Sequence, residues 1–201
     1  MSEVNGYNLE KLVGQFQIVA EFVDGYAWTK GHINDTYIIN CRQGGSPIRY
    51  ILQRINHHVF QQPAVVMQNV KEATQHLRKK IASESPADLT RRTMTLVPTR
   101  GGASYYMDSA GNYWRAYVFI ERVKSSHVAE KPEQAEQVGR AFGLFQKRLV
   151  DLPTERIQET IPQFHNGVLR IYALERRLGK TNKIGLSQHN RRLIFVEPTG
   201  A

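Results

Sequence analysis

The sequence predicts an α+β fold in which an antiparallel sheet with one inserted helix is followed by helices. Three observations predict it. Short runs rich in β-branched and aromatic residues recur between positions 26 and 123, separated by turns that contain Gly or Pro. A single stretch of helical apolar spacing, 63–81, interrupts these runs. From Pro132 to position 178 only helical spacing remains.

The first element is a helix predicted over 8–22. Apolar residues recur there at helical intervals, and Asn8 suits the N-cap. Three strands in antiparallel succession come next, because each run is separated from the following one by a short turn. They are predicted at 26–29, 36–41 and 49–55.

The inserted helix, 63–81, begins with Pro63, a residue suited to a first helical turn. Three further strands follow a polar connection; they are predicted at 93–99, 104–108 and 113–123. The turn Ser-Ala-Gly-Asn joins the last two as a hairpin. The alternating Tyr113, Arg115, Tyr117 and Phe119 are interpreted as residues that pack the sheet.

The clearest amphipathic helix follows Pro132. Its apolar residues lie at positions 135, 138, 142, 145 and 149. A second helical stretch, 168–178, ends at Gly179. The last segment, 179–201, has little periodicity.

Composition indicates a cytoplasmic protein. The 201 residues are 41% hydrophobic and 22% charged, and Cys41 is the one cysteine. No apolar run is long enough for a membrane span, so we expect no membrane partner.

The net charge of +9 includes seven bases against one acid in 170–192. Such a patch is typical of polyphosphate or nucleic-acid binding, or of a solvated helix face with a loose end. We prefer the second interpretation and expect no nucleic-acid partner.

The order of elements is that of a kinase amino-terminal lobe with the start of the helical lobe. Five segments resemble the aminoglycoside-phosphotransferase-like kinases, in particular the N-acetylhexosamine 1-kinase branch, also called mucin desulfatase. They are GHINDTYIIN (31–40), YILQRINHHVFQQPAVVMQNV (50–70), WRAYVFIE (114–121), VGRAFGLFQKRLVDLP (138–153) and ETIPQFHN (159–166). The resemblance covers about residues 10–178. It implies a nucleotide-binding lobe at 1–125, an incomplete helical lobe at 126–178 and an irregular tail at 179–201.

The resemblance implies that the loop at Gly31, between the first two predicted strands, lies over the phosphates of ATP. Gly31 would permit close backbone approach. Asn34 and Thr36 match the family's Gly-x-x-Asn-x-Thr-Tyr pattern and would either bond phosphate or brace the hairpin. His32 and Asp35 are interpreted as turn residues at the lip of the loop rather than as catalytic groups.

Gln53 stands where many kinases carry a lysine, and we leave open whether it contacts the nucleotide or lines the site. Arg54 faces the other side of the strand, because side chains alternate with a period of two. Glu72 would either correspond to the helix glutamate that forms an ion pair with that lysine in many kinases or, as we prefer, be a solvated residue. Main-chain groups of Glu121 and Val123 would bind the adenine edge.

This family places a catalytic aspartate in a His-x-Asp motif after the helical hairpin, and a later aspartate holds magnesium. All five aspartates of this chain precede Leu152; they are Asp24, Asp35, Asp88, Asp108 and Asp151. We therefore predict no catalytic and no metal-binding residue here, and expect the chain to end before the catalytic half.

The expected parent protein is an ATP- and magnesium-dependent kinase that transfers the γ-phosphate to a hydroxyl of a sugar such as an N-acetylhexosamine. This chain would bind nucleotide and be inactive alone, and the sugar would bind only the full-length parent. Two alternatives stay open: a non-catalytic, pseudokinase-like or basic binding module, and a non-functional gene fragment.

Overall fold

The computed structural model describes residues 3–29, 31, 33–84, 87, 89–123 and 128–181. The chain divides into two compact units, Met1–Thr160 and Ile161–Ala201. The first contains an antiparallel sheet and the second contains α5 (Gly167–Thr181), so the fold is α+β as predicted. Most of the predicted tail, 182–201, lies outside the described residues.

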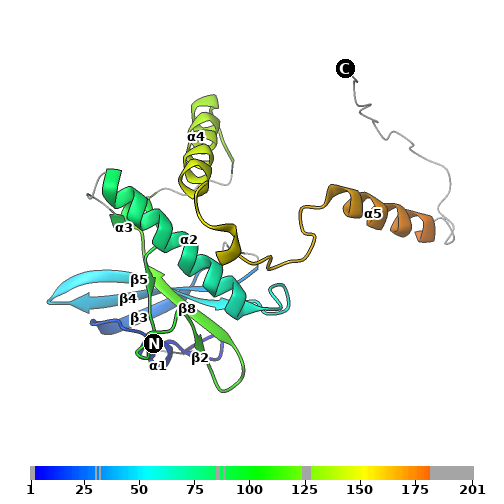
Figure 1. Ribbon diagram of the computed structural model, residues 1–201. Coiled ribbons are helices and arrows are strands. Elements are labelled where there is room, and N and C mark those ends of the chain that lie inside the picture. The colour runs from blue at the N-terminus through cyan, green and yellow to red at the C-terminus, as the bar shows by residue number, and fades with distance from the viewer. Residues whose placement is uncertain are drawn as a thin grey trace. The chain divides into compact units, whose positions relative to one another are not determined.

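One antiparallel sheet of six strands organises the described part of the first unit (Figure 1). Its order is β3-β4-β5-β8-β6, and β7 pairs with β8 beside β6. The strands are β3 (Glu21–Ala27), β4 (Asp35–Gln43), β5 (Ser46–Ile55), β6 (Leu96–Val97), β7 (Tyr106–Met107) and β8 (Tyr113–Val118). Each predicted strand has a counterpart, but the last three are shorter than predicted.

The first helix is also shorter than predicted. α1 spans Leu9–Val13, and Asn8 caps it by accepting a hydrogen bond from the backbone N–H of Lys11 at 2.9 Å. Beyond the helix, Phe16 pairs with Thr99 in an isolated bridge. Phe16 and Ile18 therefore pack through tertiary contacts rather than along a helix stripe, and Val19 is exposed. A short hairpin, β1 (Glu3–Val4) with β2 (Tyr7–Asn8), precedes α1.

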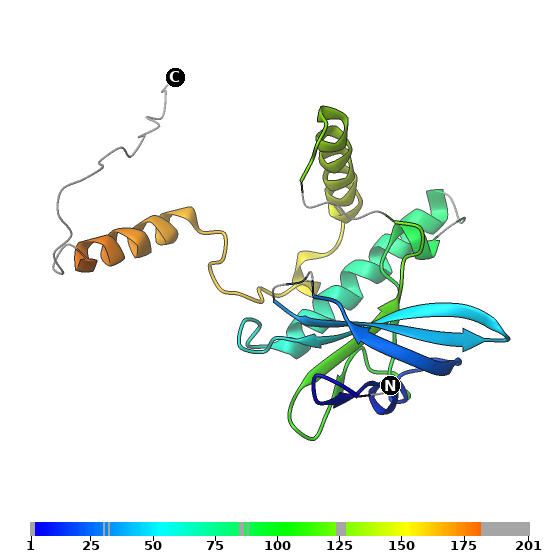
Figure 2. The same cartoon turned by 180° about the vertical axis from the view of Figure 1, so that it is seen from behind.

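The two faces of the sheet differ in what covers them. α1 and the hairpin β1–β2 lie on one face, and α2 (Pro63–Glu84) crosses the other (Figures 1 and 2). The α1 face is the apolar core of the unit, where Tyr37, Leu52 and Trp114 are at most 1% exposed. α2 buries Met67, Leu77 and Ile81.

The remaining helices are α3 (Leu89–Arg92), the 3-10 turn η1 (Thr154–Arg156) and α4 (Pro132–Leu149). Polar contacts hold the end of α4 to α2, since His76 and Lys80 both bond Asp151. The helix confirms the prediction, but its apolar side is exposed: Val138 is 54% and Phe142 65% accessible. None of the described helices combines the length and apolar character needed to cross a membrane.

Candidate functional site

A row of three polar side chains crosses the α2 face of the sheet. Cross-strand register places Thr36 of β4 opposite Gln53 of β5, and Gln53 opposite Arg115 of β8. Directly opposed residues point to the same face, so the three side chains meet. Gln53 Nε2 donates to Thr36 Oγ1 at 2.7 Å, and Arg115 Nε and Nη2 donate to Gln53 Oε1 at 2.9 and 2.6 Å. We call Thr36, Gln53 and Arg115 the polar row.

Arg115 carries the charge of the polar row. Burial lowers the pKa of its guanidinium, and Nη1 lies 3.8 Å from the Met67 sulfur of α2. Within the described residues no carboxylate pairs with this cation, and its hydrogen-bond acceptors, the Gln53 amide and the Met67 sulfur, are neutral. A partly buried cation without a counter-charge is costly, so the arrangement favours an incoming anion.

Gly31 stands beside the Thr36 end of the polar row. A Cβ atom on it would lie 4.0 Å from Thr36 Oγ1 and 3.7 Å from the carbonyl oxygen of Asn34. Both are ordinary contacts, so packing does not require a glycine here. Lys30 and His32, the sequence neighbours of Gly31, lie outside the described residues.

Asn34 braces the hairpin, which is one of its two predicted roles. Its Oδ1 accepts from the backbone N–H of Asn56 at 2.9 Å, and Asn56 Nδ2 donates to the carbonyl oxygen of Ile33 at 3.0 Å. The loop is thereby tied to the segment that follows β5. The amide oxygen of Asn34 is thus already engaged within the chain.

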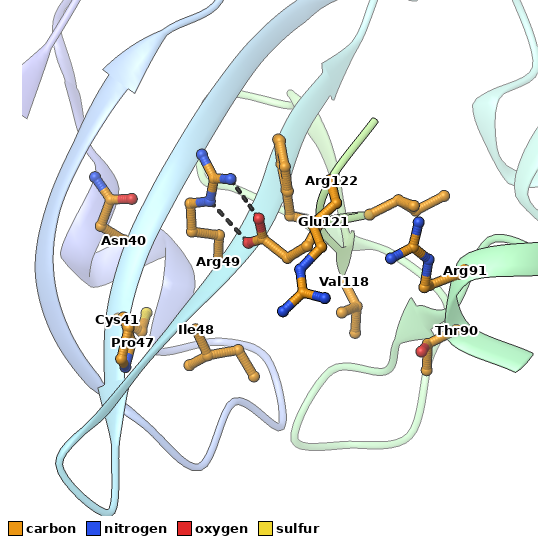
Figure 3. Close-up of a pocket in the computed structure, with 12 residues that line it drawn as sticks. Asn40, Cys41, Pro47, Ile48, Arg49, Thr90, Arg91, Val118, Glu121 and Arg122 are labelled. Carbon is orange, nitrogen blue, oxygen red and sulfur yellow. Dashed lines mark hydrogen bonds and ion pairs between the residues drawn. The ribbon is translucent and has the colours of Figure 1, made fainter. Parts of the chain in front are cut away.

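Glu121 lies at the other end of β5, in the linker that begins where β8 stops at Val118. Its carboxylate accepts from Arg49 Nε at 2.8 Å, and this hydrogen bond lowers the pKa of Glu121 (Figure 3). The Arg49 guanidinium also lies 4.0 Å from the centre of the Phe119 ring. Val123 is exposed.

The predicted nucleotide contacts therefore fall into two groups. Gly31, Thr36 and Gln53 lie together near the C-terminal end of β5. Glu121 and Val123 lie in the linker after β8, where Glu121 contacts Arg49 near the N-terminal end of β5. Arg49 and Gln53 are four residues apart on β5, about 13 Å along an extended strand. An extended ligand along β5 would reach from one group to the other.

Glu72 does not join the polar row through any contact among the described residues. It accepts a hydrogen bond from Gln68 at 2.9 Å and lies 3.7 Å from Arg156 of η1. Only 19% of its side chain is exposed. Glu72 is therefore neither the partner of Gln53 nor the freely solvated residue that we preferred.

Four aspartates are described, and each is engaged by its own chain. The partners are Asn40 for Asp24, Arg54 for Asp35, Asn112 and Trp114 for Asp108, and Lys80 for Asp151. Asp35 begins β4 rather than lying in the turn, and Arg54 faces away from the polar row, as predicted. Asp88 lies outside the described residues.

Sequence reasoning missed Arg115, which it assigned to packing. The sequence did contain a signal for it. Arg115 lies between Trp114 and Ala116, two core residues, and strand alternation places its side chain on the face opposite to theirs. Its proximity to Gln53 depends on the pairing of β5 with β8, which no local pattern reveals.

No group of three or more His, Cys, Asp and Glu side chains in the described part of the chain is placed to hold a metal ion. No protein-family model matches the chain.

Proposed function

We propose that residues 1–125 form the nucleotide-binding lobe of an ATP-dependent kinase acting on a small molecule. The supporting observation is the polar row beside Gly31, with a partly buried cation that lacks a carboxylate partner. The element order and the segments that resemble the aminoglycoside-phosphotransferase-like kinases support the same assignment. The kinase-like lobe and the ATP site are proposals on these grounds.

In this proposal Arg115 supplies the charge that Gln53 cannot. A guanidinium binds phosphate oxygens through several N–H donors, whereas an amide contributes dipole but no charge. Two of the guanidinium's N–H groups are held by Gln53 Oε1, and Gln53 is itself held by Thr36. Gln53 thus positions the cation, and Gly31 leaves room for phosphates next to it.

The linker holds the base of the nucleotide in the same proposal, through main-chain groups near Glu121 and Val123. ATP would supply the phosphoryl group that is transferred to an acceptor hydroxyl. The resemblance alone supports a sugar such as an N-acetylhexosamine as the acceptor. We assign no catalytic base and no magnesium ligand among the described residues, since their aspartates are engaged and do not cluster.

ATP titration of the chain by calorimetry tests this proposal. We compare the natural chain with Arg115→Met and with Arg54→Gln, which removes the same charge from the opposite face of the sheet. Loss of one charged contact predicts about 10- to 100-fold weaker binding for Arg115→Met. Arg54→Gln should stay within about twofold, because Arg54 pairs with Asp35.

The absence of saturable ATP binding by the natural chain would make the proposal wrong, and the basic-module alternative would then be tested. Equal weakening by both substitutions would show a general charge effect and would remove Arg115 from the site. Sugar-dependent ATP consumption by this chain, abolished by Gly31→Val, would contradict our expectation that the chain is inactive alone.

A further inference from the structure

A second site is suggested by a cavity of about 700 Å³ near the turn end of the β4–β5 hairpin (Figure 3). The hairpin, the linker 118–122 and α3 line it. Its volume is in the range of small-molecule sites. None of the residues that line the cavity belongs to the polar row.

The cavity carries excess positive charge. Of the charged residues that line it, Glu121 is paired with Arg49, whose hydrogen bond keeps the carboxylate ionised. Arg91 of α3 and Arg122 of the linker have no ion pair or hydrogen bond to other described residues. In Figure 3 the Arg122 side chain lies near the middle of the cavity and the Arg91 side chain stands at its α3 side. Two guanidinium groups are therefore available to one ligand.

Arg122 is held in an unusual backbone conformation. Its φ is 57°, in the left-handed region that non-glycine residues rarely occupy. Such strain persists where the surroundings impose it and is concentrated at ligand sites. Here it occurs at the residue whose side chain extends into the cavity.

The rest of the lining is apolar. Ile48 and Val118 are partly buried against the core, and Pro47 closes the hairpin side. A ligand with an oxyanion at one end and a flat or aliphatic body at the other matches both parts of the lining. Guanidinium groups bind phosphate and carboxylate oxygens in bidentate fashion.

We propose that this cavity binds a small organic oxyanion, with Arg91 and Arg122 on the phosphate or carboxylate and Ile48 and Val118 on the organic body. The cavity shares Glu121 of the linker with the proposed adenine contacts, but Arg91, Arg122, Ile48 and Val118, on which this second proposal rests, have no role in the proposed nucleotide site. Binding is non-covalent and needs no other reactant.

Phenyl phosphate and benzoate, titrated separately by NMR line shifts, are suitable probes. We expect saturable binding of at least one, weakened about tenfold or more by Arg91→Gln and by Arg122→Gly. Arg122→Gly removes the cation and also suits the positive φ, so this variant should fold at least as well as the natural chain. Arg42→Gln, an equal charge loss on the same hairpin outside the cavity lining, should change the affinity less than twofold.

Stronger binding of phenyl phosphate than of benzoate would identify a phosphate ligand, and the reverse a carboxylate. Absence of saturable binding for both probes would overturn the proposal. Binding that survives Arg91→Gln and Arg122→Gly but is lost in Arg115→Met would also overturn it, because the anion would then occupy the polar row.

Discussion

The two faces of the sheet show how one set of strands performs two tasks. Strands β4, β5 and β8 present Tyr37, Leu52 and Trp114 to the α1 face, where each is at most 1% exposed. The sequence neighbours of these residues, Thr36, Gln53 and Arg115, point to the α2 face of the same strands. The first set forms a dry core, and the second forms a hydrogen-bonded row around a cation without a carboxylate partner among the described residues.

The α2 face is partly apolar too, since Met67, Leu77 and Ile81 are buried there, but the polar row adds to it a cation that folding does not need. An uncompensated cation adds little to stability and can reduce it. Core truncations should therefore affect unfolding, whereas changes in the polar row should affect binding.

The largest effect is expected from Trp114→Ala. The indole is fully buried, and its Nε1 donates to Asp108 Oδ2 at 2.8 Å. Its removal should lower the free energy of unfolding by about 3–5 kcal/mol in urea denaturation. The neighbour Tyr113 is the matched control, because it faces α2 and is only partly buried. An equal loss from Tyr113→Ala would contradict the division between the faces.

Asp108→Asn should have a smaller effect that depends on pH. Burial alone would raise the pKa of Asp108, but hydrogen bonds from Trp114, Asn112 and Ala110 outweigh it and lower the pKa. Because the folded pKa is below the unfolded value of about 3.9, the stabilisation is present above that pH and is lost as the pH falls through the folded pKa.

The substitution should cost about 1–3 kcal/mol at pH 7 and flatten the acid limb of the stability curve. Urea melts between pH 7 and pH 2 measure both quantities. Glu21→Gln, which removes an exposed carboxylate from β3, should leave the acid limb unchanged. An unchanged acid limb in Asp108→Asn would show that the Asp108 carboxylate does not contribute to the pH dependence of stability.

Two glycines give the finest comparison. A Cβ atom on Gly25 would lie 2.7 Å from a methyl of Leu9 and 3.0 Å from a methyl of Ile39, so Gly25→Ala should cost about 1–3 kcal/mol. Gly31→Ala meets no close atom and should change stability by less than about 0.5 kcal/mol. Gly31→Ala should nevertheless weaken ATP binding. Thermal melts and ATP titrations of both variants test the pair, and destabilisation by Gly31→Ala would weaken the case for a ligand role.

Local sequence patterns predicted the elements whose own residues determine them. The β4–β5 hairpin follows from alternation around Gly44 and Gly45, which adopt positive φ in the turn. α2 begins at Pro63, where its fixed φ favours a first turn. In both cases short-range geometry is sufficient.

Features set by distant contacts were not predictable in this way. The apolar spacing of 8–22 suits a helix, but Phe16 pairs with Thr99 and the chain enters β3 at Glu21. Thr36 and Gln53 were each named from the sequence as nucleotide contacts, and the structure brings their side chains together. Arg115 completes the polar row only through the β5–β8 register, which depends on the whole sheet.

Urea unfolding of the natural chain and of Arg115→Met, each with and without saturating ATP, tests the central claim most directly. Without ATP the variant should be as stable as the natural chain or more stable, because a desolvated cation has been removed. ATP should raise the unfolding midpoint of the natural chain and leave that of the variant nearly unchanged. A destabilised variant that ATP still stabilises fully would contradict the account, since Arg115 would then serve the fold rather than the ligand.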